Sequence, residues 1–160
     1  MSIRQLSQVE INRIAAGEVI ERPASAIKEL VENAIDAGST SIEIIAQDGG
    51  LSLLRVTDDG CGMDEADLSL CIERHATSKL PAGNLQDIRT LGFRGEALPS
   101  LGSVAALRIV TKPAAFVRGF EISVENGRKS AIRPAAAPRW NSAPAIPNAS
   151  TRTGTTCWCC

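Results

Sequence analysis

The chain has 160 residues, of which 44% are hydrophobic and 22% charged, with a formal net charge of −1. This composition is typical of a globular domain, and the missing basic excess gives no support to nucleic-acid binding through charge. No stretch approaches the roughly 20 apolar residues that span a bilayer, and the amino terminus lacks a signal-peptide core. We therefore expect a cytoplasmic domain, or part of a larger one, without membrane contact.

The first third of the chain shows helical spacing of its apolar residues. The pattern predicts one helix over residues 9–21 and a second that begins near Pro23, a residue suited to the first helical turn. Gly38 suits the left-handed position that ends this second helix. The apolar stripe of the second helix, at i, i+3, i+4, i+7 and i+8, consists of Ile27, Leu30, Val31, Ala34 and Ile35.

Strand patterns follow the second helix. Residues 40–47 and 51–58 are rich in β-branched and apolar residues and predict two strands joined by a Gly49-Gly50 turn. Asp64 is expected to cap a short helix through Glu73.

The second half of the chain begins with a predicted helix that runs toward Val104. "ALRIVTK" and "GFEISVENGRKSAIRP" then predict strands, with a type I′ hairpin turn at Asn126-Gly127. After Pro134 prolines recur and no periodicity survives. We therefore expect an ordered domain over residues 1–138 and an irregular tail over residues 139–160.

Two polar residues interrupt the second helix. Glu29 and Asn33 are four positions apart, so they share one helix face. A carboxylate can take a proton from an attacking water, and a carboxamide oxygen is a hard ligand for Mg²⁺. The alternative is that both are ordinary solvated residues of an amphipathic helix.

Three later stretches also carry candidate chemistry. Asp58, followed by "DGCGM", can accept a hydrogen bond from an exocyclic amine, although a tight turn also explains it. The hydroxyls and ammonium of Thr77, Ser78 and Lys79 suit phosphate or ribose, although a capped loop explains them too. The "GFRGEAL" stretch leads into a helix whose amino terminus could bind an anion, or it is a structural glycine-hinged loop.

Together these motifs resemble a known superfamily. "ELVENAIDAG", "DDGCGM", "RHATSK" and "GFRGEAL", in this order, are similar to the ATPase motifs shared by type II topoisomerases, a heat-shock chaperone, sensor histidine kinases and MutL. "INRIAAGEVIERPASAIKELVENAIDAGS" and "GFRGEALPSLGSV" resemble the MutL family of DNA mismatch repair proteins. The resemblance is close over residues 3–107 and looser to Pro138. It implies an ATP-binding domain over residues 1–138, folded as an α/β sandwich with helices on one face of a mainly antiparallel sheet.

The resemblance also implies roles for individual residues. Glu29 is expected to be the general base, and Asn33 to bind the Mg²⁺ that bridges the phosphates of ATP. Asp58 is expected to bind the adenine amino group, with Gly62 lining the base pocket. Thr77, Ser78 and Lys79 are expected to lie along the nucleotide. A lid that holds the terminal phosphate is expected to consist of Gly92, Phe93, Arg94, Gly95, Glu96, Ala97 and Leu98.

At the level of the whole protein, the resemblance implies an ATP-driven switch that couples mismatch recognition to repair. The expected partners are a mismatch-recognition protein and a downstream nuclease and helicase. The family forms an ATP-dependent homodimer and contacts DNA through regions that have no counterpart in this chain.

The chain departs from the family pattern after "RPAAAP". A G-T-x-[VI]-x-V-x-x-L-F segment is expected there, and only "GTT" at 154–156 resembles it. Our hypothesis is that the domain is incomplete at its carboxyl end, either because the coding frame is lost near Pro138, which would put residues 139–160 out of frame, or because the gene is truncated. We expect weak or no turnover in either case.

Two alternative interpretations remain open. One is a remnant that keeps the motifs but neither hydrolyses ATP nor folds stably. The other is the ATP-binding domain of a sensor kinase, which predicts a phospho-acceptor histidine on a preceding helical hairpin. The single histidine, His75, follows Glu29 rather than preceding it, which argues against the kinase.

Overall fold

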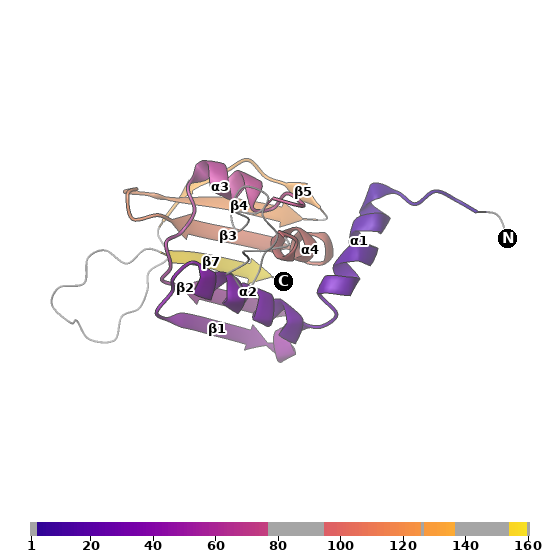
Figure 1. Cartoon of the computed structure of the whole chain (residues 1–160), viewed down its shortest axis with the longest axis horizontal. Coiled ribbons are helices and arrows are strands. Elements are labelled where there is room, and N and C mark those ends of the chain that lie inside the picture. Colours follow the sequence, from indigo (N-terminus) through magenta and orange to yellow (C-terminus); the bar gives the residue numbers. More distant parts are fainter. Residues whose placement is uncertain (1–2, 77–94, 126, 137–153, 160) are drawn as a thin grey trace, which may run out of the picture.

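The computed structural model describes residues 3–76, 95–125, 127–136 and 154–159 (Figure 1). Its helices are α1 (Gln8–Val19), α2 (Pro23–Asp36), α3 (Glu65–Leu70) and α4 (Ala97–Val104). A short 3₁₀ turn, η1, covers Asp48–Gly50. The strands are β1 (Ile42–Gln47), β2 (Leu53–Asp58), β3 (Leu107–Lys112), β4 (Gly119–Glu125), β5 (Arg128–Lys129), β6 (Arg133–Ala135) and β7 (Gly154–Cys159).

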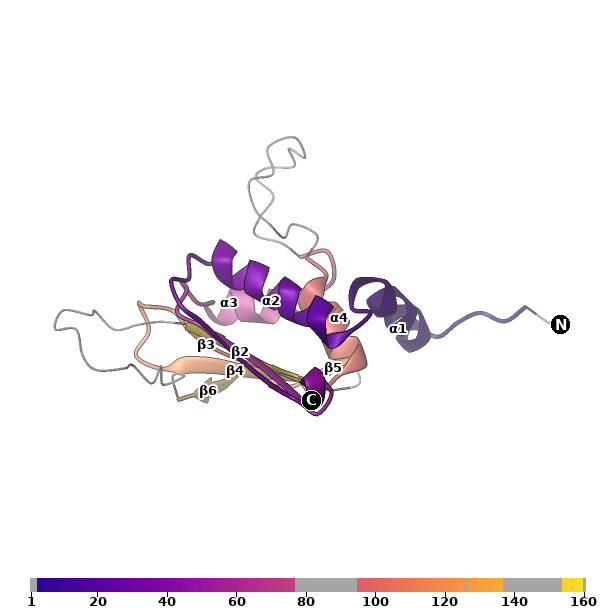
Figure 2. The same ribbon diagram turned by 90° about the horizontal axis from the view of Figure 1, so that it is seen from below.

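The strands form one antiparallel sheet. Its order is β1-β2-β7-β3-β4-β5, and β6 pairs with β4. Ile44 lies opposite Val56 in the β1–β2 pair, and Ile109 lies opposite Ile122 in the β3–β4 pair. Figure 2 shows α2, α3 and α4 together on one face of this sheet, and none of the described helices covers the other face. The expected α/β sandwich is thereby confirmed.

The hydrophobic core lies between the sheet and the helices. Leu30 of α2, Leu68 of α3 and Leu101 of α4 are almost fully buried. They pack in one cluster with buried strand residues that lie on the same face of the sheet, namely Leu54, Val56, Leu107, Ile109, Ile122 and Val124. Removing this apolar area from water, at about 25 cal/mol per Å², is what holds the helices on the sheet.

Helix α2 has both of the end signals that the sequence predicts. Pro23 occupies the first helical turn, and Gly38, at φ 77°, ends the helix in the left-handed region. The buried face differs slightly from the predicted stripe. It is built on Ala26, Leu30 and Ala34, while Ile35 at the end of the stripe is 50% exposed. The helix therefore presents its small residues to the sheet, which allows a close approach.

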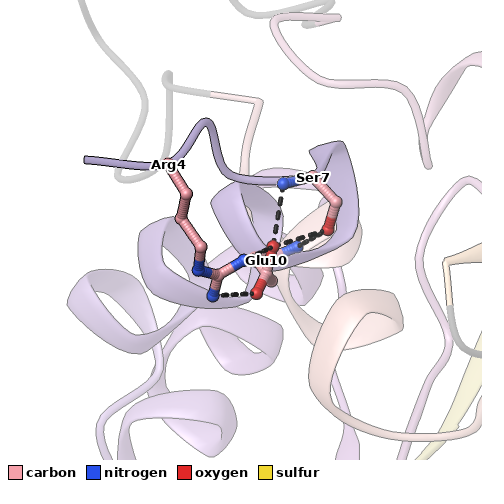
Figure 3. A network of polar contacts seen from close by, with 3 residues as sticks. All are labelled: Arg4, Ser7 and Glu10. Atoms are coloured by element: carbon pink, nitrogen blue, oxygen red, sulfur yellow. Dashed lines mark hydrogen bonds and ion pairs between the residues drawn. The ribbon is translucent and has the colours of Figure 1, made fainter. Parts of the chain in front are cut away.

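Helix α1 begins with a capping box. The Ser7 hydroxyl accepts a hydrogen bond from the Glu10 amide, and the Ser7 amide donates to the Glu10 carboxylate at 2.8 Å. Arg4 donates to the same carboxylate at 2.7 Å (Figure 3). These contacts, with Arg4 as the largest cause, lower the pKa of Glu10 to about 2. Helix α1 packs mainly against α4, beside the sheet rather than on it (Figure 1).

Two elements differ from the expectation. Residues 139–160 were expected to be irregular, but Gly154–Cys159 form β7 between β2 and β3, where both edges of the strand are paired. In this central position the strand pairs with backbone N–H and C=O groups of both neighbouring strands. These partners are distant in the sequence, so local sequence patterns do not predict the pairing. Helix α3 is capped by Asp64 as expected but ends at Leu70 rather than Glu73.

Of the helices in the described part of the chain, none is long and apolar enough to span a membrane.

Candidate functional site

Helix α2 carries the two polar residues that the sequence singles out. Its buried side faces the sheet, and Glu29 and Asn33 are half-buried on the remaining surface. Lys28 lies beside them, 3.7 Å from the Glu29 carboxylate and 2.8 Å from that of Glu32. The hydrogen bond to Glu32 is the main cause that raises the pKa of Lys28. Glu29 therefore lies in a charged, partly solvated setting rather than in an apolar one.

The loop that follows β2 is attached to the carboxyl end of α2. The Cys61 amide donates a hydrogen bond to the Ala37 carbonyl at 3.0 Å. Gly60 is buried, and a Cβ at this position would lie 2.8 Å from the Cβ of Ala37. Only glycine permits such a close approach of the loop to the helix end. The loop bearing Asp58 and the helix bearing Asn33 thus form one packed unit.

Asp58 is held at the end of β2 by two donors. The Ser39 hydroxyl donates to its Oδ1 at 3.2 Å, and the Gly60 amide donates to the same oxygen at 2.9 Å. The Asp58 side chain is half-buried, so it meets both protein and solvent. This geometry orients the carboxylate where strand, loop and helix end come together. Ser39 was not among the predicted site residues, and its only sequence signal is its place directly after Gly38.

The neighbouring carboxylate of Asp59 has a different environment. It accepts hydrogen bonds from the Thr40 amide and hydroxyl, both at 2.8 Å, and from the Ser41 amide at 2.9 Å. Burial works against ionisation, but these donors outweigh it and hold the pKa of Asp59 below its ordinary value. Asp59 therefore binds the residues that lead into β1, whereas Asp58 contacts the segment at the carboxyl end of α2.

The glycine-rich part of the loop runs against the end of β3. Gly62 has φ 69°, and a Cβ there would lie 2.8 Å from the carbonyl carbon and oxygen of Lys112. The Met63 amide donates to the Thr111 hydroxyl at 2.8 Å. Thr111 is fully buried, so this bond anchors the loop to the sheet. Position 62 must therefore be glycine both for its conformation and for its space.

The start of α4 contacts the segment that follows α3. Gly95 has φ 62°, and a Cβ there would overlap the Ala76 carbonyl oxygen. The Glu96 carboxylate lies 3.9 Å from Arg74 and 3.2 Å from Nδ1 of His75. Arg74 was not predicted to take part in the site. Ala97 and Leu98 form the first turn of α4 and are half-buried.

Other predicted site residues cannot be placed. Thr77, Ser78, Lys79, Gly92, Phe93 and Arg94 lie outside the described residues. The structure thus attaches the loop that carries Asp58 and Gly62 to Ala37, at the end of the helix that carries Asn33. Glu29 lies one turn earlier on the same helix, and α2 packs against α4, the helix that begins beside Gly95 and Glu96.

An open cavity of about 760 Å³ lies elsewhere, along β4, β5 and β6. It is lined by Glu121, Ser123, Glu125, Arg128, Lys129, Ser130 and Arg133. None of the predicted nucleotide-site residues within the described ranges lines it, and its charges of both signs favour no single ligand class. We therefore assign the candidate site by the motif geometry around α2.

The described residues offer no preformed metal cage. Among residues 3–76, 95–125, 127–136 and 154–159, no group of three or more His, Cys, Asp or Glu side chains is placed to hold an ion. A site with one oxygen ligand from the protein would suit Mg²⁺, which usually keeps several waters and takes further oxygens from phosphates.

Chemically, the arrangement offers an acceptor, a neutral oxygen ligand and a carboxylate. Asp58 can accept from an exocyclic amine, and its neighbouring glycines allow a planar ring to approach the backbone. Asn33 supplies a carboxamide oxygen, and Glu29 supplies a carboxylate that can accept a proton from water. These are the groups that a nucleotide and its hydrolysis require.

Comparisons with known proteins agree with this chemistry. Residues 20–136 match the family model described as histidine kinase-, DNA gyrase B-, and HSP90-like ATPase. The chain is 64% identical over 137 residues to the DNA mismatch repair protein MutL of Sinorhizobium medicae, covering 86% of this chain and 22% of that protein. It is 58% identical over 139 residues to MutL of Beijerinckia indica, with 87% and 22% covered. The chain thus spans about a fifth of the length of the relatives it matches.

Solved structures give the same result. The amino-terminal domain of a DNA repair protein matches with a TM-score of 0.68 and 31% identity, over 93% of this chain and 38% of that one. The MutL ATPase domain of Aquifex aeolicus complexed with ADP matches with a TM-score of 0.59 and 26% identity, over 88% of this chain and 42% of that one.

Proposed function

Because the chain belongs to the family of histidine kinase-, DNA gyrase B- and HSP90-like ATPases, we propose that it is the ATP-binding part of a MutL-type DNA mismatch repair protein. The observation that carries the proposal is the attachment of the Asp58 loop to the end of α2 through Gly60 and Ala37. This contact joins the acceptor proposed for adenine to the helix proposed to face the phosphates. The similarity to a MutL ATPase domain that was solved with ADP supports the choice of ligand.

In this proposal Asp58 accepts a hydrogen bond from the adenine amino group, and Gly62 lets the base approach the backbone. Gly95, Glu96, Ala97 and Leu98 form the described end of a segment that binds the terminal phosphate through backbone amides. The start of α4 suits this role, because first-turn amides have no partner within a helix and Glu96, at the amino-terminal cap, makes no side-chain capping bond to them. Thr77, Ser78, Lys79, Gly92, Phe93 and Arg94 complete the nucleotide contacts in the same proposal.

Magnesium is the proposed cofactor, with Asn33 as its ligand from this chain. The donor chemistry fits, because a carboxamide oxygen is a hard neutral ligand and the site needs no larger set of protein ligands. When bound, Mg²⁺ neutralises charge on the phosphates of ATP. Asn33 would hold the ion from this chain and would thereby place the phosphates beside α2.

Glu29 is the proposed general base. It lies one helical turn before Asn33 on α2, so it faces the same bound phosphates. Its carboxylate would accept a proton from the water that attacks the terminal phosphate. The Lys28 ammonium lies 3.7 Å from this carboxylate, so the base sits beside a cation at the surface of α2.

At the level of the whole protein, we propose a role in mismatch repair with partner proteins. ATP binding and hydrolysis would switch a homodimer between states that recruit a mismatch-recognition protein and a downstream nuclease or helicase. DNA contact would come through regions outside this chain. The cytoplasmic location expected from the sequence belongs to the same proposal.

Nucleotide titration tests this function directly. The full chain is titrated with ATP labelled with a fluorophore on the ribose, with Mg²⁺ or with EDTA, beside Asn33→Ala. The expected result is saturable binding that unlabelled ATP displaces and that tightens with Mg²⁺ in the parent but much less in Asn33→Ala. An absence of displaceable binding would contradict the proposal and favour the alternative, a chain that keeps the motifs without the activity.

A further inference from the structure

The Ser39 side chain lies between the carboxyl end of α2 and the carboxyl end of β2. It follows Gly38, the residue that ends α2, and it is half-buried beside the Asp58 carboxylate. Its hydroxyl donates to Oδ1 of Asp58 at 3.2 Å. A Cβ built on Gly60 would lie 2.9 Å from the Ser39 Oγ and 2.9 Å from that same Oδ1. The hydroxyl, the carboxylate and the loop backbone are therefore packed in direct contact.

Two donors on one carboxylate oxygen limit how the group can rotate. The Gly60 amide comes from the loop and the Ser39 hydroxyl from the helix end, so they approach Oδ1 from different elements. The Gly60 amide ties the carboxylate to its own loop, two residues away in the chain. The Ser39 hydroxyl adds the link that fixes the carboxylate relative to α2.

We propose that Ser39 is a positioning residue that sets the selectivity of the nucleotide site for adenine. This inference rests on the proposed function and adds to it a residue to which no role has been given. A carboxylate only accepts hydrogen bonds, so it pairs with the 6-amino group of adenine and repels the 6-oxo group of hypoxanthine or guanine. The discrimination depends on direction, because a hydrogen bond weakens steeply when its angle departs from linearity. By holding Oδ1, Ser39 keeps the carboxylate aimed at the amino group.

The adjacent residues provide a matched control. Thr40 donates from its hydroxyl to Asp59 at 2.8 Å, just as Ser39 donates to Asp58. Both hydroxyls thus anchor a carboxylate across the same junction between α2 and β2. Of these two pairs, only Ser39–Asp58 contains the carboxylate proposed to accept from adenine. Only the loss of the Ser39 hydroxyl should therefore change which nucleobase is preferred.

The test compares ATP with inosine triphosphate, which carries an oxo group in place of the amine. Affinities of the full chain for both nucleotides are measured by competition for the parent, Ser39→Ala, Ser39→Thr and Thr40→Ala. We expect Ser39→Ala to weaken ATP binding about fivefold, the factor for one ordinary hydrogen bond. Inosine triphosphate affinity stays unchanged, so the ratio of the two affinities falls about fivefold. Thr40→Ala keeps the parent ratio, and Ser39→Thr, which retains the hydroxyl, restores it.

The outcomes separate the two claims. Equal weakening of both nucleotides by Ser39→Ala, or an unchanged ratio, would overturn the positioning role while leaving ATP binding intact. A ratio that falls equally in Thr40→Ala would overturn it as well, because the effect would then belong to the junction as a whole. A parent chain that binds neither nucleotide would overturn the proposed function and this inference with it.

Discussion

Gly60 and Ala37 are so close that a Cβ added at position 60 would lie 2.8 Å from the Ala37 Cβ. The Cys61 amide next to Gly60 donates to the Ala37 carbonyl at 3.0 Å. The contact is both steric and polar, and it couples the loop after β2 to the end of α2. The candidate site depends on this coupling, because Asp58 lies on one side of it and Asn33 on the other.

Gly60→Ala should therefore damage the site as well as the fold. The new methyl group would also meet the Asp58 Oδ1 and the Ser39 Oγ, each at 2.9 Å. Overpacking of this kind costs about 1–3 kcal/mol. We expect a lower melting temperature and a loss of nucleotide affinity larger than the loss of stability explains, measured by thermal melts and nucleotide titration.

Gly17→Ala is the control for this substitution. Gly17 lies in α1, and a Cβ there meets nothing within 4 Å. Alanine in place of glycine within a helix adds about 0.5–1 kcal/mol of stability. Stabilisation by Gly17→Ala with destabilisation by Gly60→Ala would support the steric account, whereas equal effects of the two would argue against it.

Glu29→Gln should separate binding from turnover. The amide keeps the size of the side chain but cannot act as a base, and general base catalysis contributes about 10²–10⁴-fold. We expect parent-like nucleotide affinity and at least a 100-fold loss of whatever phosphate release the parent shows, measured in single-turnover assays with the chain in excess over ATP. Parent-like phosphate release from Glu29→Gln would remove Glu29 from the proposed role.

The capping box of α1 predicts a pH dependence at acid pH. Contacts from Arg4 and then Ser7 lower the pKa of Glu10 from 4.5 to about 2. A lowered carboxyl pKa means that the native state favours the ionised form, so its contribution to stability is complete above about pH 4.5 and is lost as the pH falls through about 2. Arg4→Ala should raise the pKa of Glu10, which carboxyl NMR titration would show. An unchanged titration in Arg4→Ala would contradict the contact in Figure 3.

The two cysteines of the described core region should differ in reactivity. Cys61 is exposed in the loop after β2, whereas Cys71 is half-buried, donates to the Leu68 carbonyl at 3.2 Å, and has its pKa raised to about 12, chiefly by burial. The thiolate is the reactive form, so a raised pKa slows alkylation. Peptide mapping after brief treatment with iodoacetamide at pH 8 should find Cys61 modified well before Cys71. Equal rates would contradict the packing of α3 on the sheet.

Local signals predicted α2 well because they act within the helix itself. Pro23 and Gly38 mark its two ends, and a 3.6-residue period marks its buried side. Ile35 was assigned to the buried stripe but is 50% exposed, because the face that packs on the core is centred on Ala26, Leu30 and Ala34. This rotation of the buried face depends on tertiary packing, which periodicity alone does not encode.

The strand β7 was missed for a related reason. Its backbone is paired along both edges by residues about 50 to 100 positions away in the chain, such as Val56 and Ile109 opposite Cys157. A segment preceded by several prolines gives no local indication of such partners. The pairing, rather than the composition of the segment, defines this strand.

The candidate site was predicted as separate motifs, and the structure adds the links between some of them. Glu29, Asn33 and Asp58 were identified by residue type and spacing, and Gly62 by the family resemblance. The contacts of Ser39 and Arg74 were not predicted, because each depends on a partner far away in the sequence. The partner is Asp58 for Ser39 and Glu96 for Arg74. The roles of Glu29, Asn33 and Asp58 in nucleotide chemistry stay predictions.

The most direct test of the account is a thermal melt with and without Mg²⁺ and a non-hydrolysable ATP analogue, for the parent and for Asp58→Asn. The asparagine keeps an oxygen for the bonds from Ser39 and Gly60 but presents an amide group to the adenine amine. At about 100 times its dissociation constant a ligand adds roughly 2.7 kcal/mol to the native state. The account predicts a clear rise in melting temperature for the parent and little or none for Asp58→Asn, with both variants melting cooperatively without ligand. A cooperative parent melt that the nucleotide leaves unchanged, or an equal rise in both variants, would contradict it.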